Sequence, residues 1–227
     1  MDFTRAFQDI AICDLSDACD SLEIAAVTSG RISPVYGNCP KICGPAVTYR
    51  LSTEASGSVV IGTLEGIRDA APGSVLLFDA SGFEDYNAWG SIAATVAMQH
   101  RMAGAVVEGS TRDVQTMRSL PCPTYATGTV VTSVRGRIGL ESINAPVTVA
   151  ANRVDPGWIV AADENGVICF PPDRAEAVFR RAYQVAALEN RIIRAIQEGA
   201  DAIGIHKQMN YDASWQDQLG SPAEGNR

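Results

Sequence analysis

The sequence predicts a single α/β domain that ends in a long helix, and three stretches of the chain support this. In residues 72–79 a turn is followed by a continuous apolar run, as expected for a strand that is buried on both faces. Residues 91–102 have a helical composition and lead through a glycine into a second short strand, residues 105–109. Residues 173–198 follow a proline pair and predict the long helix. Strands that alternate with helices are typical of α/β domains.

The N-terminal third is expected to supply a helix, a strand and another helix. Residues 14–22 begin with acidic and hydroxyl side chains, so Asp14 or Ser16 is expected to be the N-cap of a helix. Residues 43–51 are rich in β-branched and aromatic side chains and predict a strand. Residues 57–70 have a composition that suits a helix.

The second half is expected to add short strands before the long helix. Several short strands are expected within residues 121–149, and another at 167–170. Residues 156–163 repeat the Pro-Gly turn and apolar strand of residues 72–79. An internal duplication and an independent use of the same turn-and-strand solution both explain this repeat.

The domain is expected to span residues 1–227, with residues 200–227 as a C-terminal extension. After Gly199 the sequence becomes polar and rich in turn-forming residues, so residues 214–227 are expected to be mobile unless a neighbouring subunit holds them.

The composition points to a soluble, cytoplasmic protein that acts on a small molecule. The chain has 227 residues, 46% of them hydrophobic, and a net charge of -8 spread along its length. This charge disfavours nucleic acid and polybasic membrane attachment, and no apolar run approaches the ~20 residues of a membrane helix. The N-terminus has no apolar secretory segment.

The six cysteines are interpreted as reduced thiols. Only Cys39 and Cys43 lie close together, and the chain contains just two histidines, so a four-ligand structural zinc site is hard to assemble. Reduced thiols are the rule in cytosolic proteins.

The local pattern with the clearest chemistry is a glycine before a helix, together with an arginine and an aspartate after a strand. Gly90 precedes the helix that begins with Ser91, Ile92 and Ala93, and the free backbone N–H groups at a helix start suit a carboxylate. We therefore expect the amides of residues 90–93 to bind a substrate carboxylate.

Arg112 and Asp113 follow the strand at residues 105–109, on the edge where α/β proteins gather ligands. Neighbouring side chains on an extended segment point in opposite directions, so no tight ion pair between them is expected by default. At a turn both could face outward, where Asp113 could hold Mg²⁺ and Arg112 could neutralise an oxyanion. From this dipeptide alone, an ordinary surface turn is the simpler interpretation.

Similarity over most of the chain favours the chemical interpretation. The segments that carry it are, in order along residues 14–200, Ser16-Asp17-Ala18, Gly44-Pro45-Ala46-Val47-Thr48, Pro72-Gly73, Trp89-Gly90, residues 103–113, Pro156-Gly157 and residues 162–167. In these segments the chain resembles the RraA-like family, which includes 4-hydroxy-4-methyl-2-oxoglutarate and 4-carboxy-4-hydroxy-2-oxoadipate aldolases that also decarboxylate oxaloacetate, and regulators of ribonuclease E.

The resemblance implies a fold, an assembly and a set of site residues. The fold would be the layered β/β/α swivelling, phosphohistidine-domain-like fold, and the protein would assemble as a homotrimer or homohexamer. Gly90, Ser91, Ile92, Ala93 and Arg112 would bind the pyruvyl unit of a 2-oxo acid. Asp113 would bind the divalent metal, Mg²⁺ or Mn²⁺.

The chain departs from the aldolase pattern at two positions. Aldolases of the family usually carry acidic residues at the positions of Ser91 and Thr116. A hydroxyl supports Mg²⁺ less well than a carboxylate does, so both departures weaken the expected metal site.

The resemblance also implies that Glu189, on the long C-terminal helix, acts catalytically in the site of a neighbouring subunit. The alternative is an exposed helix residue paired with Arg191 or Arg194. The apolar side chains of this helix cover a broad part of its surface, so they can face more than one neighbour. This favours a homo-oligomer over the alternative, in which the helix only covers the sheet of its own chain.

The scarcity of lysine and histidine narrows the mechanism. Only Lys41 and Lys207 could form a Schiff base, and neither lies in an apolar strand that would lower its pKa. His100 and His206 are expected to be surface or packing residues rather than a general base. The sequence has no dinucleotide or P-loop motif.

Three functions remain open at this point. The first is a metal-dependent lyase that cleaves a 2-oxo acid, by retro-aldol reaction or decarboxylation, through a pyruvate enolate. The second is a non-catalytic protein that regulates a partner through its surface. The third is an enzyme of the same fold that acts on another hydroxy or sugar acid.

Overall fold

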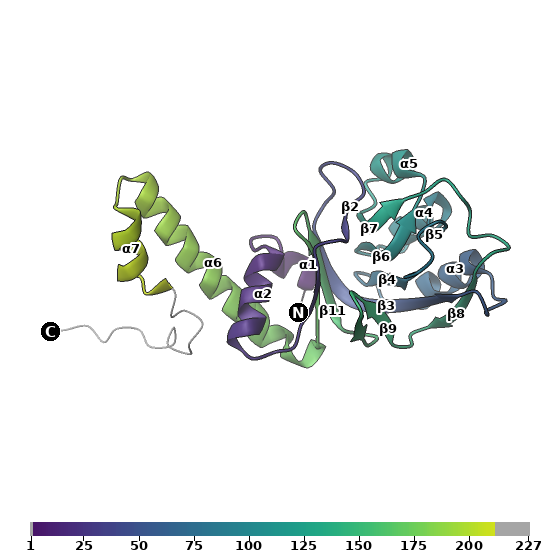
Figure 1. The fold of residues 1–227 in the computed structure, drawn as a ribbon, viewed down its shortest axis with the longest axis horizontal. Coiled ribbons are helices and arrows are strands. Elements are labelled where there is room, and N and C mark those ends of the chain that lie inside the picture. Colours follow the sequence, from purple (N-terminus) through teal and green to yellow (C-terminus); the bar gives the residue numbers. More distant parts are fainter. Residues whose placement is uncertain (1, 212–227) are drawn as a thin grey trace.

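The computed structural model describes residues 2–211, in which a curled ten-stranded mixed sheet organises the chain (Figure 1). Its strands follow the order β1-β12-β11-β3-β4-β6-β7-β2, with β5 paired to β6 and β8 paired to β3, and β9 and β10 form a separate ribbon. The strands are β1 (Val27–Ser29), β2 (Ser33–Pro34), β3 (Ile42–Ser52), β4 (Val75–Asp79), β5 (Asn87–Trp89), β6 (Gly104–Thr111), β7 (Thr124–Thr129), β8 (Gly139–Ile143), β9 (Val147–Val149), β10 (Asn152–Val154), β11 (Ile159–Asp163) and β12 (Gly166–Phe170).

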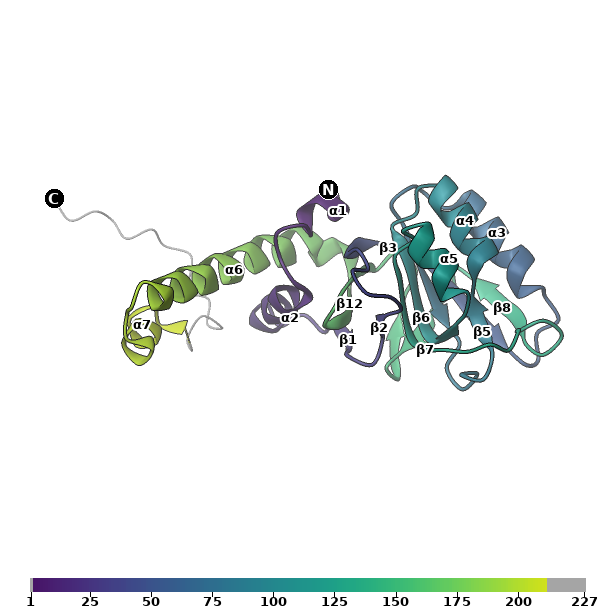
Figure 2. The ribbon, with the colours of Figure 1, turned by 90° about the horizontal axis from the view of Figure 1, so that it is seen from above.

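The parallel centre of the sheet is formed by β3, β4, β6 and β7, and helices cover one of its faces (Figure 2). These helices are α3 (Val59–Asp69), α4 (Ser91–Gln99) and α5 (Val114–Ser119). The core beneath them contains an aromatic stack, in which the ring centroids of Tyr49 and Phe78 lie 4.5 Å apart and Trp89 lies 5.5 Å from Phe78. All five residues of β4 are buried, because the sheet is covered on its second face as well.

The second face of the sheet is covered by the β9–β10 ribbon and by the curl of the sheet itself. Val75, Leu77 and Val106 from the parallel strands pack in one buried cluster with Val149 and Val160. Two packed layers of strands and one layer of helices result. This arrangement confirms the predicted single α/β domain with the layered β/β/α fold.

A third cluster lies at the other edge of the sheet, where two helices pack on β11 and β12. Leu15 of α2 (Ile12–Ser21) and Phe179 of α6 (Ala175–Gln197) are fully buried there against Phe170. α6 continues beyond the sheet and carries α7 (Ala202–Gln208) at its far end, while the short α1 (Phe3–Ala6) lies near the sheet (Figure 1).

The long periodic elements are confirmed, and their boundaries differ for local reasons. The helix expected at 14–22 begins at Ile12, and Ala11 is its N-cap. Asp14 is therefore not the N-cap; its carboxylate accepts a hydrogen bond from the Ala11 N–H at 2.6 Å. The helix expected at 91–102 ends at Gln99, and the next strand extends from Gly104 to Thr111.

The C-terminal region contains more helix than its polar, turn-rich sequence predicts. A 3₁₀ turn (Pro172–Arg174) precedes α6, and the region after Gly199 contains α7. Asp201 caps α7 by accepting a hydrogen bond from the Gly204 N–H, a pattern typical of helix starts. The predicted mobility of residues 214–227 concerns a segment outside the described residues.

Within residues 2–211, no helix combines the length and the apolar content that a membrane span requires.

Candidate functional site

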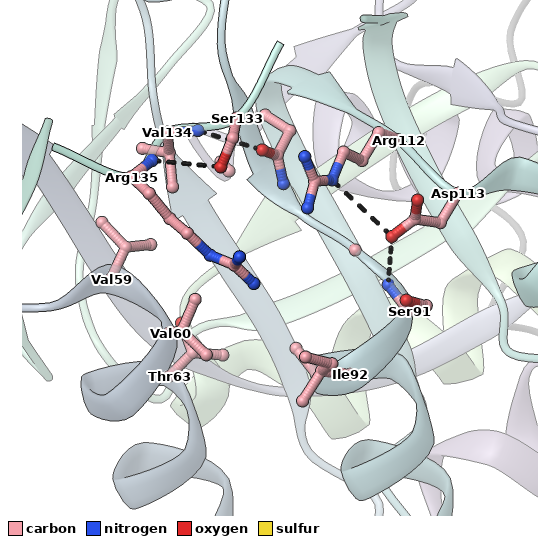
Figure 3. A pocket seen from close by; sticks show the side chains of 14 residues that line it. Val59, Val60, Thr63, Ser91, Ile92, Arg112, Asp113, Ser133, Val134 and Arg135 are labelled. Carbon is pink, nitrogen blue, oxygen red and sulfur yellow. Dashed lines mark hydrogen bonds and ion pairs between the residues drawn. The ribbon is translucent and has the colours of Figure 1, made fainter. Parts of the chain in front are cut away.

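An open pocket lies where the starts of α3 and α4, the end of β6 and the segment before β8 meet (Figure 3). Side chains from both predicted motifs line it: Gly90, Ser91, Ile92, Ala93, Arg112 and Asp113. The two motifs meet because β5, which leads into α4, pairs in parallel with β6. Their carboxyl ends therefore reach the same edge of the sheet, as expected for ligand sites in α/β proteins.

Arg112 and Asp113 both line the pocket because the chain turns sharply after β6. Asp113 adopts a left-handed backbone conformation with φ 64°, which aspartate tolerates better than most residues. Arg112 Nε lies 3.7 Å from Asp113 Oδ2, which is a loose ion pair and agrees with the expectation that the two form no tight pair. Both side chains keep access to solvent, with exposed fractions of 28% and 34%.

The carboxylate of Asp113 is held against the start of α4. Its Oδ2 accepts a hydrogen bond from the Ser91 N–H at 3.0 Å (Figure 3). The Ser91 N–H, helped by the Ser91 side chain and by Arg112, lowers the pKa of Asp113 below its ordinary value of 3.8. Asp113 is therefore ionised at neutral pH.

Gly90 allows this close approach. Its backbone is extended, so any residue could adopt its φ and ψ, but a Cβ atom there would lie 3.0 Å from Asp113 Oδ2. The glycine is needed for space rather than for conformation. It brings the carboxylate and the helix start together.

The hydrogen bond to Asp113 changes the expected carboxylate cradle. The Ser91 N–H is already used, which leaves those of Gly90, Ile92 and Ala93 from the expected set for a ligand. The interpretation that residues 90–93 all offer their amides is therefore wrong for Ser91. The reason is that Asp113 itself acts as the anion at this helix N-terminus.

Asn87 links the parts of the pocket, and the sequence analysis did not identify it. Its side chain is buried, donates to the Trp89 carbonyl at 3.1 Å and accepts from the Val134 N–H at 3.1 Å. A further bond from the Asn87 N–H to the Thr132 carbonyl holds the segment before β8 against β5.

Arg135 also lines the pocket and was not identified from the sequence. Its guanidinium reaches between α3 and α4 (Figure 3), and among residues 2–211 it has no hydrogen-bond or ion-pair partner. In the sequence, Arg135 looks like any exposed arginine in an irregular segment. Only its position at the pocket distinguishes it from other surface arginines.

Thr63, on α3, is the third lining residue that the sequence analysis did not identify. It is 1% exposed, and its hydroxyl has no hydrogen-bond partner among the described residues. Buried hydroxyls are normally paired, and helical threonines often bond to the carbonyl four residues earlier. Thr63 lines the pocket, but its hydroxyl oxygen has almost no accessible surface.

Asp113 is the only carboxylate that lines this pocket among the described residues. Ser91 stands beside it, whereas Thr116 is exposed on α5 and contacts Asp113 only through a backbone hydrogen bond. In the described part of the chain, no three His, Cys, Asp or Glu side chains cluster in a way that could hold a metal ion.

Glu189 lies on α6, at the opposite end of the molecule from α4 and α5 (Figure 1). Its carboxylate accepts a hydrogen bond from the Tyr211 hydroxyl rather than an ion pair with a neighbouring arginine. Burial, and next the charge of Glu189, raise the pKa of Asp17 on α2 to about 6. An acidic pair thus lies on the α2–α6 side, and one chain does not bring it to the pocket.

The lysines and His100 lie away from the pocket. Lys41 donates to the carbonyls of Ile10 at 2.8 Å and Gln8 at 3.0 Å, and Lys207 is exposed on α7. His100 is exposed at the end of α4, as expected for a surface residue.

The chain is similar in sequence to known proteins. Residues 12–169 match the RraA-like family, described as Aldolase/RraA. A protein of Halalkalibacterium halodurans named "Putative 4-hydroxy-4-methyl-2-oxoglutarate aldolase" is 30% identical over 203 residues, which cover 89% of this chain and 92% of the relative. Protein DlpA of Legionella pneumophila is 28% identical over 210 residues. These residues cover 92% of this chain but only 34% of the length of DlpA.

Solved structures agree on the fold. A crystal structure of an uncharacterized protein from Pseudomonas syringae superimposes with a TM-score of 0.82 at 25% identity, covering 90% of this chain and 92% of the other. RraAS2 of Streptomyces coelicolor, described as an unusual member of the RNase ES inhibitor RraA protein family, gives 0.72 at 22% identity, with 82% and 93% covered. The sequence match over more than half of the chain, together with this shared fold, places the protein in the RraA-like family.

Proposed function

We propose that this protein is a metal-dependent lyase that cleaves the C3–C4 bond of a 2-oxo acid through a pyruvate enolate. The observation that carries the proposal is the meeting of an ionised Asp113, the guanidinium of Arg112 and the free amides of Ile92 and Ala93 in one pocket. Relatives named as 4-hydroxy-4-methyl-2-oxoglutarate aldolases support this reaction class.

The residues present fit a divalent cation held by a single protein ligand. Oδ2 of Asp113 is used by Ser91 and Arg112, and no described residue hydrogen-bonds to its Oδ1. Mg²⁺ and Mn²⁺ are often bound by one or two carboxylates, with water and substrate oxygens completing the shell. When bound, such a cation supplies Lewis-acid polarisation of the 2-oxo group.

The chain's own groups bind and orient the pyruvyl unit. The Ile92 and Ala93 N–H groups, at the positive end of the α4 dipole, would receive the C1 carboxylate. The planar guanidinium of Arg112 would donate to the oxygen that gains negative charge as the enolate forms.

The proton that the reaction moves requires an acid or base near C3, and within residues 2–211 the pocket of one chain offers none besides Asp113. Glu189 on α6 is a carboxylate that fits this task if it is supplied by a neighbouring copy. The proposal therefore includes a homotrimer or homohexamer.

A regulatory, non-catalytic role is the second candidate, and one observation favours it. The positions where aldolases of the family carry acidic residues hold Ser91 and Thr116, and Asp113 is left as the only lining carboxylate among the described residues. Action on another hydroxy or sugar acid is an enzymatic variant of the first candidate.

Pyruvate release tests the proposal directly. The protein is incubated with oxaloacetate or 4-hydroxy-4-methyl-2-oxoglutarate plus Mg²⁺ or Mn²⁺, and then with EDTA. Turnover that EDTA abolishes is expected. Turnover that resists chelation would rule out the metal, and absence of turnover with both substrates would favour the regulatory role.

Light scattering tests the assembly. A mass of three or six chains is expected at micromolar concentration. A stable monomer of 24.1 kDa would contradict the shared site.

A further inference from the structure

The hairpin formed by α6 and α7 lies far from the pocket of its own chain, at the other end of the molecule (Figure 1). α7 lies beside the far end of α6 in both views (Figures 1 and 2). The chain reverses at Gly199, whose φ of 96° is a backbone conformation that suits glycine, and Asp201 then caps α7. This reversal brings Tyr211 back to Glu189 on α6.

Tyr211 makes a specific polar contact with Glu189. Its hydroxyl donates a hydrogen bond to Glu189 Oε1, and this contact raises the pKa of Tyr211, because ionisation of the phenol would remove the donor beside a carboxylate. The His206 ring lies beside the Tyr211 ring, with centroids 5.1 Å apart. Both rings line an open hollow at Glu189, together with Ile192 and Ile193.

The carboxylate of Glu189 has a single donor and several acidic neighbours. Tyr211 is the only group within residues 2–211 that hydrogen-bonds to it. Cys13, Asp14 and Asp17 of α2 lie close enough to respond to its charge: burial raises the pKa of all three groups, and the negative charge of Glu189 adds to the effect. Because the carboxylates of α2 repel Glu189, the Tyr211 hydroxyl is the contact that holds its side chain in one orientation.

Orientation matters for the role that Glu189 has in the proposed function. A carboxylate that moves a proton must be aimed at the reacting atom, and a misplacement of about 1 Å can cost ~100-fold in rate. Glutamate is a flexible side chain, and a charge-assisted hydrogen bond restricts its rotation.

We propose that Tyr211 is a positioning residue, whose hydroxyl orients the Glu189 carboxylate for proton transfer in the site of the neighbouring copy. The α6–α7 hairpin is the element that supplies this hydroxyl. The inference rests on the proposed function for the role of Glu189, and its test separates the two.

The contact is tested without turnover, by fluorine NMR of the full chain labelled with 3-fluorotyrosine. Loss of a signal in Tyr211→Phe identifies the signal of Tyr211. This signal should move in Glu189→Gln, because the acceptor loses its charge. It should stay in place in Glu176→Gln, a charge control on the same helix whose exposed carboxylate pairs with Arg180.

Pyruvate release from 4-hydroxy-4-methyl-2-oxoglutarate or oxaloacetate, with Mg²⁺, tests the consequence of the contact. Tyr211→Phe should lower kcat about tenfold and leave KM near its wild-type value, because the carboxylate is misaimed while substrate binding is unchanged. In a Glu189→Gln background the same change should add no further loss, since its effect passes through the carboxylate. Tyr183→Phe is the matched control, because it removes a hydroxyl of α6 that donates to the Ala6 carbonyl, and it should leave kcat unchanged.

The outcomes distinguish the two proposals. Three results would overturn the positioning role and leave the proposed lyase intact: a Tyr211 signal that does not respond to Glu189→Gln, an unchanged kcat in Tyr211→Phe, or a loss that persists in the Glu189→Gln background. A lower mass of Tyr211→Phe in light scattering would assign the loss of kcat to assembly and would also overturn it. Absence of pyruvate release from the wild type, with a Tyr211 signal that still responds to Glu189→Gln, would overturn the proposed function and show that the contact exists without it.

Discussion

Replacing Asp113 by asparagine tests the centre of the proposed site. Asparagine tolerates the left-handed backbone at this position and keeps an oxygen that can accept from the Ser91 N–H, so the main change is the loss of charge. We expect metal-dependent pyruvate release to fall at least ~100-fold. Mn²⁺ affinity, measured by calorimetry, should fall with it.

The cost in stability should be small. A hydrogen bond to a charged group contributes ~1.5–3 kcal/mol and a neutral one ~0.5–1.5 kcal/mol, and the 34% exposure of the Asp113 side chain reduces the difference. The expected loss is about 1 kcal/mol, or roughly 2–4 °C in Tm for a domain of this size. Because the folded pKa of Asp113 lies below 3.8, this contribution is present above that pH and is lost as the pH falls through the folded pKa.

Asp155→Asn is the matched control. Asp155 has a similar side-chain exposure of 39% and an arginine partner, Arg153 at 2.6 Å, and it lies outside the pocket. Its replacement should leave turnover unchanged. Full metal-dependent activity in Asp113→Asn, or an equal loss in Asp155→Asn, would show that the site is placed on the wrong residue.

Two further substitutions probe the surroundings of Asp113, and a third probes Asp17 on α2. Arg112→Lys should retain Mn²⁺ binding by calorimetry and lower kcat ~100-fold, because a point charge replaces a planar donor; unchanged kcat would exclude Arg112 from the reaction. Ser91→Asp restores a carboxylate beside Asp113 and should tighten Mn²⁺ binding about tenfold in the same calorimetric measurement; weaker binding would contradict a metal at this place. Asp17→Asn should raise the free energy of unfolding by about 1 kcal/mol above pH 6 and should leave it unchanged near pH 4. The reason is that the pKa of Asp17 is raised to about 6 in the folded protein, so its ionisation costs stability as the pH rises from 3.8 through 6. Denaturant unfolding at both pH values checks this. An equal gain at both pH values would place the cause elsewhere.

The sequence predicted the elements whose periodicity or composition is strong. The buried strand β4 and the long helix α6 were found close to their observed bounds because continuous apolar runs and proline starts are local properties. β5 was missed, since its three residues carry no periodicity and their burial depends on pairing with β6.

The site could be predicted only in part for the same reason. Arg112 and Asp113 are neighbours in sequence and belong to a recognisable segment. Thr63 and Arg135, by contrast, reach the pocket only through the tertiary fold, which brings α3 and the segment before β8 beside α4. The use of the Ser91 amide by Asp113 depends on an approach that Gly90 permits in three dimensions. Neither the hydrogen bond from Ser91 to Asp113 nor the arrival of Thr63 and Arg135 at the pocket can be recognised from the local sequence.

The distance between Glu189 and Asp113 along the molecule has a genetic consequence. In a ring whose sites each combine Asp113 of one subunit with Glu189 of the next, two inactive variants can repair each other when their subunits are mixed. A random equal mixture of Asp113→Asn and Glu189→Gln chains would regain about a quarter of the sites, because a site works only where an intact Asp113 meets an intact Glu189. In the same ring, a Glu189 variant would disable the site of its neighbour and leave the site at its own Asp113 able to work.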